Sequence, residues 1–339
     1  MKKYLFILAF SLLSVFSLKA EEDSTDMNAF ILGHITDSYE WHITSVNDHP
    51  VSIYLPVILR DSHGNWHLFS SEKIVHSGEY ENFVIGENGK IMERLEDGEL
   101  KKPFDISITK NVLALFCNSL VLLLVILIPA GWYKRHDAAK EVPRGFTGLI
   151  EMMICMIMDD VIKPCVGEDY KKYSSFLLTA FFFIFVNNLM GIVPFFPGGA
   201  NVTGNIAITL CLAVFTFLAV NIFGNKHYWK EILWPDVPVP LKAPIPLMPL
   251  IEIVGIFTKP FSLMIRLFAN ITAGHIMLLG VISVIFLTAN MGAMLNGSLS
   301  VVAILFGVFL DILELLVAYI QAYVFTMLSS VFIGLSRQH

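Results

Sequence analysis

Long apolar stretches with almost no charge constrain this chain more than any other feature. Residues 111–132 are rich in Leu and Val and contain no charged side chain. A helix needs about 20 such residues to cross the hydrocarbon core of a bilayer. Uncharged stretches follow at residues 174–196 and 202–223. The sequence therefore predicts an all-α polytopic membrane protein.

Two further apolar stretches, at residues 246–289 and 298–336, are too long for one upright crossing. At 1.5 Å per residue the first would reach about 65 Å, against a hydrocarbon core of about 30 Å. It either folds into a hairpin or forms one steeply tilted helix. We expect two long tilted helices, because a hairpin would move the C-terminus to the other side. With an amphipathic interfacial helix at residues 146–166, the prediction is five membrane-embedded helices plus that one.

The first 110 residues have a different composition. Lys2 and Lys3 precede the apolar run 4–18, and Ala20 offers a small residue at a cut, which is typical of a signal peptide at residues 1–20. An uncleaved anchor helix is the alternative. Residues 21–110 hold 17 acidic and 7 basic side chains, and β-like runs at 51–60 and 66–69 alternate with turns at 61–65 and 86–89. We therefore expect a small β-rich exported (periplasmic) domain at 21–110 and a membrane domain at 111–339.

Charge and cysteine patterns narrow the class of protein. Basic residues mark alternate links between the apolar stretches, which places the N-terminal domain outside the cell inner membrane and the C-terminus in the cytoplasm. A net charge of −6 gives no basic patch for nucleic acid. Neither the four cysteines nor the six histidines of residues 21–110 follow a metal-ligand spacing, so these histidines are expected at the surface. No phosphate-cradling loop occurs, so no cofactor and no catalysis by this chain are expected.

Ionisable residues interrupt the two long stretches. Glu252, Lys259 and Arg266 are seven apart and share a helix face, with Asn270 four residues further on. His275 lies nine residues beyond Arg266, on the opposite side. The last stretch carries Asp311, Glu314 and Gln321, and the latter two share a face.

Arg266 is the least expected of these residues. An arginine in the middle of a membrane helix costs about 2.5–3.5 kcal/mol on insertion scales, and such a charge is functional by default. Lys259 and Glu252 lie nearer a helix end and can extend to the interface. Asp311 and Glu314 would suit His275, so Arg266 is left for an acid on another chain. His275 and Glu314 can pass protons, whereas Arg266 keeps its proton.

These residues occur in segments that resemble a known family. Residues 259–275 (KPFSLMIRLFANITAGH) and 315–328 (LLVAYIQAYVFTML) resemble the hallmark helices of subunit a of the F-type ATP synthase, and residues 187–194 (NNLMGIVP) fit it more loosely. The resemblance covers about residues 111–336. The domain at 21–110 departs from the family's usual short N-terminus.

The resemblance implies a function and partners. Arg266 would face the carboxylates of the c-subunit ring, with Asn270 and Gln321 beside it, and His275 and Glu314 would form a half-channel pair near Asp311. Arg266 would then separate two offset proton half-channels and couple proton flow to rotation and ATP synthesis. Implied partners are the c ring, the b subunits of the peripheral stalk, other synthase subunits and the bilayer. The sequence does not decide whether the transported ion is a proton or sodium.

Two other functions are compatible with parts of this pattern. A self-contained ion-coupled transporter also carries charges at mid-membrane, but it predicts an internal repeat and discontinuous helices, and neither is recognisable here. An exported binding domain on a passive anchor would not need Arg266.

Overall fold

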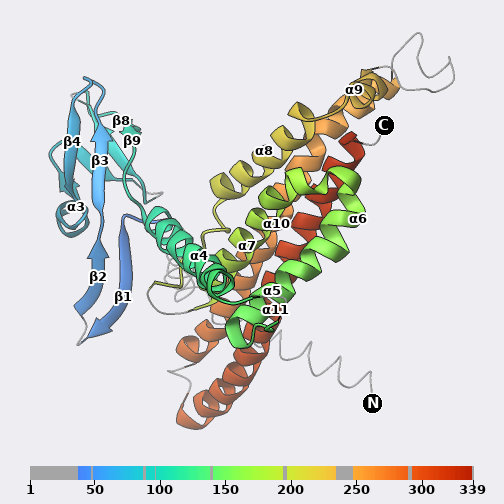
Figure 1. Ribbon diagram of the computed structural model, residues 1–339. Helices are drawn as coiled ribbons and strands as arrows, with labels where there is room; N and C mark the ends of the chain where they lie inside the picture. Colours follow the sequence, from blue (N-terminus) through green and yellow to red (C-terminus); the bar gives the residue numbers. More distant parts are fainter. Residues whose placement is uncertain are drawn as a thin grey trace, which may run out of the picture. The chain divides into compact units, whose positions relative to one another are not determined.

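The computed structural model describes residues 37–46, 49–86, 89–95, 97–137, 140–193, 197–233, 247–288 and 292–337 (Figure 1). The predicted signal peptide at residues 1–20 lies outside this part of the chain. Among the described residues, two compact units can be separated: 37–273 together with 313–337, and 274–312. Each unit is described by itself.

The β-rich segment predicted within residues 21–110 is present in the larger unit. It has three antiparallel sheets, with the strand orders β1-β2, β4-β3-β9 and β5-β6-β7-β8. Its elements are β1 (Glu40–Val46), β2 (His49–Tyr54), β3 (Pro56–Arg60), β4 (Trp66–Ser70), α3 (Glu72–Ser77), β5 (Glu79–Tyr80), β6 (Phe83–Ile85), β7 (Ile91–Arg94), β8 (Leu100–Lys101) and β9 (Phe104–Asp105).

Both predicted turns are confirmed, and so are the β-like runs beside them. The β3–β4 turn closes where the Asn65 amide donates to the Asp61 carboxylate (2.7 Å), and β6 pairs with β7 across residues 86–90. The run 51–60 is two strands that break at Leu55. The Leu55 amide donates to the Tyr39 carbonyl and the Ser71 hydroxyl, which takes it out of a regular ladder.

Alternate strand residues build a separate small core in this segment. Val57 and Leu59 from β3 and Phe69 from β4 point to the same side, as the period of two in a strand requires. They are buried with Ile74 of α3 and Phe83 of β6. The opposite side of the β4-β3-β9 sheet is therefore the outer one.

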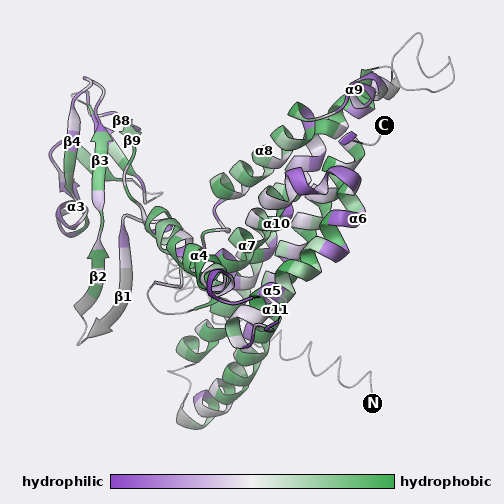
Figure 2. Ribbon diagram, viewed as in Figure 1, coloured by the Kyte–Doolittle hydropathy of each residue, from purple (hydrophilic) through white to green (hydrophobic). Residues whose placement is uncertain are grey.

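The rest of the chain is helical and mostly apolar (Figure 2). Among the described residues, four helical stretches are long and apolar enough to cross a membrane: Lys110–Arg135, Gly145–Ile192, Pro249–Leu287 and Met294–Arg337. The elements are α4 (Lys110–Arg135), α5 (Gly145–Met156), η2 (Ile157–Ile162), α6 (Lys163–Val166), η3 (Gly167–Asp169), α7 (Tyr170–Ile192), α8 (Ile206–Ile222), α9 (Lys226–Leu233), α10 (Leu247–Leu287) and α11 (Ala293–Arg337). The chain is a multi-pass membrane protein.

The structure distinguishes between the hairpin and the single helix that were considered for residues 246–289. α10 is continuous over 41 residues, so the hairpin alternative is wrong and the single helix is confirmed. α11 begins at Ala293, five residues before the predicted start at residue 298. Its first turn is closed by the Asn296 amide, which donates to the Gly292 carbonyl, while the Asn296 side chain accepts from the Thr288 hydroxyl (2.9 Å).

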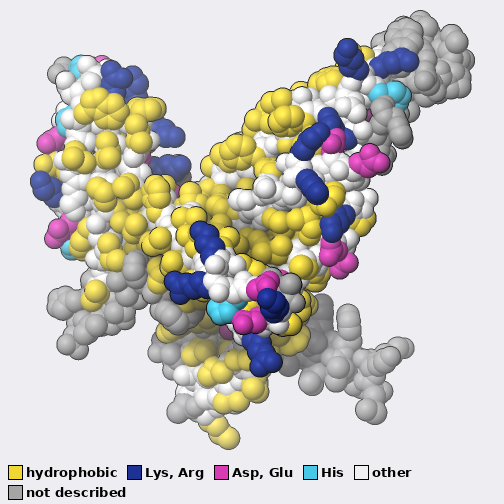
Figure 3. Space-filling model, viewed as in Figure 1, with side chains coloured by type: hydrophobic (Ala, Val, Ile, Leu, Met, Phe, Trp, Pro, Cys, Tyr) yellow, Lys and Arg dark blue, Asp and Glu magenta, His cyan; other side chains and the backbone are white. Residues whose placement is uncertain are grey.

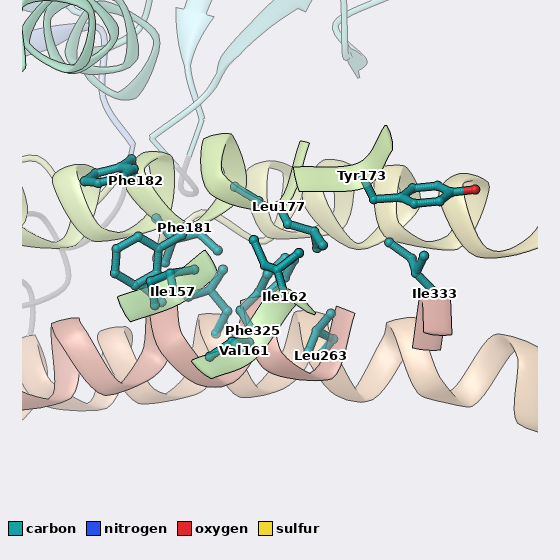
Figure 4. Close-up of a cluster of buried hydrophobic side chains, with 14 of the residues drawn as sticks. Ile157, Val161, Ile162, Tyr173, Leu177, Phe181, Phe182, Leu263, Phe325 and Ile333 are labelled. Atoms are coloured by element: carbon teal, nitrogen blue, oxygen red, sulfur yellow. The ribbon is translucent and has the colours of Figure 1, made fainter. Parts of the chain in front are cut away.

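The helices of the larger unit share one apolar core. The segment α5-η2-α6 contributes Ile157, Val161 and Ile162, which meet side chains of α7, α10 and α11 such as Phe181, Leu263 and Phe325 (Figure 4). The close approach of α11 to α6 depends on a glycine, which has no side chain. A Cβ at Gly334 of α11 would lie 1.9 Å from the Cys165 carbonyl oxygen of α6, so the two backbones pass each other in direct contact.

Hydrogen bonds attach the β-rich segment directly to the first turn of α4. The Lys110 amide donates to the Ser38 carbonyl (2.8 Å), and the Asn111 amide donates to the Asp37 carboxylate (3.0 Å). Trp41 of β1 is buried with Ala114 of α4. The segment is therefore fixed to the start of a membrane helix.

Candidate functional site

Arg266 lies on α10 at the border between a buried and an exposed face. Leu263 and Leu267, on the buried face, belong to the apolar core, whereas Ser262 and Ala269 are exposed. Within the described residues, the Arg266 guanidinium has no carboxylate or hydrogen-bond acceptor in contact. This arrangement leaves a half-exposed fixed cation available to a group outside the chain.

Asn270, one turn beyond Arg266, joins α10 to α11. Its side-chain amide donates to the Gln321 oxygen (2.9 Å), and Gln321 is buried. The bond gives the buried Gln321 side chain a partner, without which its burial would be costly, whereas Asn270 is exposed. The structure thus joins two of the predicted site residues, and their role beside Arg266 stays a prediction.

Glu314 and Gln321 lie on one face of α11, as predicted. Glu314, Ala318 and Gln321 are four and three residues apart, and all three are buried. Asp311 is exposed, and His275 is half-buried on α10. His275 and Asp311 belong to the smaller unit and Glu314 to the larger one, so their pairing stays a prediction.

A second polar group, which we call the amide cluster, comes from three other parts of the chain. The Asn118 amide of α4 donates to Asn187 of α7 (3.0 Å), and Thr203, in the link before α8, donates to Asn188 (2.6 Å). Asn188 in turn donates to the Ala318 carbonyl of α11 (3.4 Å). The members are Asn118, Asn187, Asn188, Asn201 and Thr203, and all are buried.

The amide cluster reaches α11 at Ala318, between Glu314 and Gln321. Two of its buried polar atoms, Asn118 Oδ1 and Asn201 Nδ2, have no hydrogen-bond partner among the described residues, which suits contact with water or a passing ion. In the sequence, Asn187 and Asn188 stand out only through their resemblance to a family motif, and Asn118, Asn201 and Thr203 were not predicted. The one signal in the sequence that could have indicated this cluster is Asn118, a polar residue inside the uncharged span 111–132.

A third polar location lies towards the N-terminal half of α10. Lys259 lines a small pocket with Asn221 of α8 and Tyr228 of α9. The Tyr228 hydroxyl donates to the Asn221 side chain (3.3 Å). The Lys259 ammonium group lies 5.9 Å from the ring centre of Phe332 on α11. The pocket and the amide cluster meet α11 at residues well separated along that helix.

The remaining candidate groups are the possible metal ligands, the cysteines and the histidines. Among the described residues, no group of three or more His, Cys, Asp or Glu side chains is placed to hold a metal ion. The four cysteines are free thiols. His63 and His76 are exposed, as predicted for the surface histidines, whereas His67 is partly buried. The side chains of His34, His42 and His49 lie outside the described part.

Comparison with known proteins gives separate matches for the β-rich segment and for the helical part of the chain. A family model described as ATP synthase A chain matches residues 115–334, and a model described as Domain of unknown function (DUF8433) matches residues 30–111. The chain is similar to ATP synthase subunit a 2 of Chlorobaculum tepidum, with 42% identity over 70% of this chain and 65% of the relative. It is 41% identical to ATP synthase subunit a of Pelodictyon phaeoclathratiforme (69% and 67% covered) and 37% identical to that of Myxococcus xanthus (74% and 78% covered).

Proposed function

Since this chain belongs to the ATP synthase A chain family, a family of proton-translocating membrane subunits, we propose that Arg266 is its fixed barrier between two proton paths. Protons enter from the exported side and neutralise a carboxylate on a rotating ring of c subunits. They leave through a second, offset path to the cytoplasm. Each charge that crosses supplies about 2.3 kcal/mol per 100 mV, which drives the ring.

The observation that carries this proposal is the half-exposed guanidinium of Arg266. A charge inside the membrane needs a partner, and no acid among the described residues contacts it. A ring carboxylate that passes the exposed face of α10 supplies that partner in turn. Because arginine does not release its proton at any physiological pH, the residue attracts each carboxylate but passes no proton itself.

The entry path is supported by the amide cluster. It leads from the link before α8 to Ala318 of α11, one turn from Glu314 and from Gln321. Glu314 and His275 are the groups that we assign to proton exchange on this path, together with Asp311, three residues before Glu314. The exit path follows the pocket at Lys259, Asn221 and Tyr228, which lies towards the opposite end of α11.

The proposed topology has five membrane-embedded helices: α4, α7, α8, α10 and α11. The segment α5-η2-α6 lies along the cytoplasmic interface, the β-rich segment is periplasmic and the C-terminus is cytoplasmic, in agreement with the basic links. α10 would be about 60 Å long at 1.5 Å per residue. Since the hydrocarbon core is about 30 Å thick, α10 and α11 are steeply tilted and follow the side of the ring.

The remaining parts of the proposal concern partners. The chain contacts the c ring through α10 and α11 and the b subunits of the peripheral stalk elsewhere. ATP itself is made on other subunits, so this chain needs no catalytic residue of its own.

Cysteine cross-linking tests the placement of Arg266 against the ring. In an assembled synthase whose subunit a lacks its four native cysteines, Ala269→Cys places a thiol on the exposed side near Arg266, and a second thiol is placed beside the carboxylate of the ring helix. We expect a disulfide between the two subunits. The matched control is Ile271→Cys, whose position faces the core and should not cross-link. An assembled complex that shows no cross-link from residue 269 would contradict the proposal.

A further inference from the structure

One face of the β4-β3-β9 sheet carries a row of apolar side chains that the mechanism does not use. Ile58 of β3 pairs with Leu68 of β4, and Arg60 pairs with both Trp66 and Phe104. The Ile106 amide, just after β9, donates to the Ile58 carbonyl (3.0 Å). Because alternate residues of a strand share a face, these side chains all lie on the side opposite the small core.

This outer sheet face consists of Ile58, Arg60, Trp66, Leu68, Phe104 and Ile106. Leu68 is 73% exposed, Phe104 62%, Trp66 56% and Ile106 52%. The Trp66 and Phe104 rings meet edge to face with their centres 6.4 Å apart, and the Arg60 guanidinium lies 5.8 Å from the centre of the Trp66 ring. Figure 3 shows such hydrophobic side chains gathered on the β-rich segment. Contiguous patches of this kind mark interaction surfaces.

We propose that the outer sheet face rests on the headgroup region of the bilayer that holds the helices. Trp66, Leu68, Phe104 and Ile106 enter the interface between headgroups and acyl chains. Arg60 stays at the level of the lipid phosphates. The β-rich segment is then a membrane-surface module and not a free domain.

The connection to α4 supports a lipid partner. Ile106 precedes Lys110, the first residue of α4, by four residues, so it lies within about 14 Å of the helix start at 3.3–3.6 Å per residue. Hydrogen bonds from the backbone amides of Ile108, Lys110 and Asn111 fix this connection. The outer sheet face therefore begins where the chain enters the bilayer.

Charge distribution supports the same partner. Residues 21–110 are strongly acidic, yet the outer sheet face contains Arg60 and no acid. Asp105, the acidic residue of β9, pairs with Leu59 on the inner side and accepts from the Tyr39 hydroxyl. Lys101 and Lys102 lie three and two residues before Phe104 along the chain. Tryptophan is enriched at both membrane–water interfaces, and the arginine guanidinium is suited to binding phosphate groups such as those of lipids.

Lipid-depth quenching tests this proposal on the full chain. With the native cysteines replaced, Leu68→Cys carries an environment-sensitive fluorophore in phosphatidylcholine vesicles that contain some phosphatidylglycerol and a shallow spin-labelled lipid. The control is Glu72→Cys, an exposed position of α3, which packs against the inner side of the sheet. We expect several-fold stronger quenching, and a blue shift relative to detergent, at position 68 only.

Equal quenching at the two positions would overturn the proposal. So would a label at position 68 that is protected from both the spin-labelled lipid and aqueous iodide in the whole synthase, because a protein subunit would then cover the face. Both labels replace exposed side chains, so folding is retained. Neither outcome depends on the role of Arg266.

Discussion

At the scale of single residues, the cost of polarity in an apolar medium explains the site. Asn270 and Gln321 satisfy each other across two helices, whereas Arg266 contacts no acid among the described residues. A neutral amide pair can be completed within one subunit, whereas in the proposed function the guanidinium takes its carboxylate from another subunit. The proposal therefore assigns Asn270 and Gln321 to the assembly of the subunit and Arg266 to the contact with its partner.

The two residues that are proposed to exchange protons, His275 and Glu314, give the first prediction. Replacing His275 by Glu, or Glu314 by His, should each lower ATP-driven proton pumping several-fold, because each change leaves two like groups on the entry path. The exchange of both should recover part of the flux. Dye quenching in inverted vesicles measures the pumping, and His136→Glu, at an exposed position after α4, is the control. Unchanged flux in both single variants would remove these residues from the path.

The sequence was sufficient to find Arg266 and Gln321 but not the amide cluster. A charge or a buried amide in the long helices stands out because its neighbours are all apolar. Asn118 stands in an equally apolar span, but its partner Asn187 is 69 residues away. Only the packing of α4 against α7 brings the two side chains together, and no helical period predicts that contact.

At the scale of elements, length and close packing determine the long helices. Continuous apolar sequence predicted α10 as one helix, and its bounds differ from the prediction by one or two residues. The β-like run predicted at 51–60 forms two strands, β2 and β3. The break between them was not predicted because it depends on tertiary contacts: the Leu55 amide donates to Tyr39 and Ser71. The contact between α11 and α6 at Gly334 could not be predicted either, because a glycine in a helix does not indicate which element packs against it.

This contact gives the second prediction. Gly334→Ala should destabilise the subunit by about 1–3 kcal/mol, because the new methyl group overlaps the Cys165 carbonyl and the helices must separate. Thermal unfolding of the protein in detergent measures the loss. Gly307→Ala, in the same helix, meets no described atom within 4 Å and should not lower the midpoint. Equal midpoints for the two variants would show that the helices do not meet as described.

At the scale of the whole molecule, the β-rich segment has its own polar network as well as its own core. The two ring nitrogens of His67 lie 3.2 Å from the Asp61 carboxylate and 2.8 Å from the Glu81 carboxylate. Burial lowers the pKa of His67, but the two acids outweigh this and raise it above 6.5. Burial likewise opposes the hydrogen bonds from Asn65 and His67 that lower the pKa of Asp61 below 3.8.

These shifts give a pH dependence with a definite sign. A histidine with a raised pKa stabilises the folded state fully below 6.5, and this contribution is lost as the pH rises through the folded-state pKa. Asp61 stabilises the folded state at pH values above 3.8. This stabilisation is lost as the pH falls through the lowered pKa of Asp61 in the folded state. Denaturant unfolding of the β-rich segment should therefore show declining stability above pH 6.5. His67→Gln should flatten that decline, and an unchanged slope in the variant would contradict the assignment.

Coupling of proton flow to ATP synthesis is the property of the whole assembly that Arg266 is proposed to secure. Lysine keeps a positive charge but can release its proton when buried, so Arg266→Lys should abolish the barrier while the subunit still assembles. The matched control is Lys230→Arg, the reverse exchange at an exposed position of α9. The decisive measurement is ATP synthesis by vesicles with an imposed proton gradient. We expect synthesis to be lost in Arg266→Lys and retained in Lys230→Arg, and synthesis at the normal rate in Arg266→Lys would contradict the account.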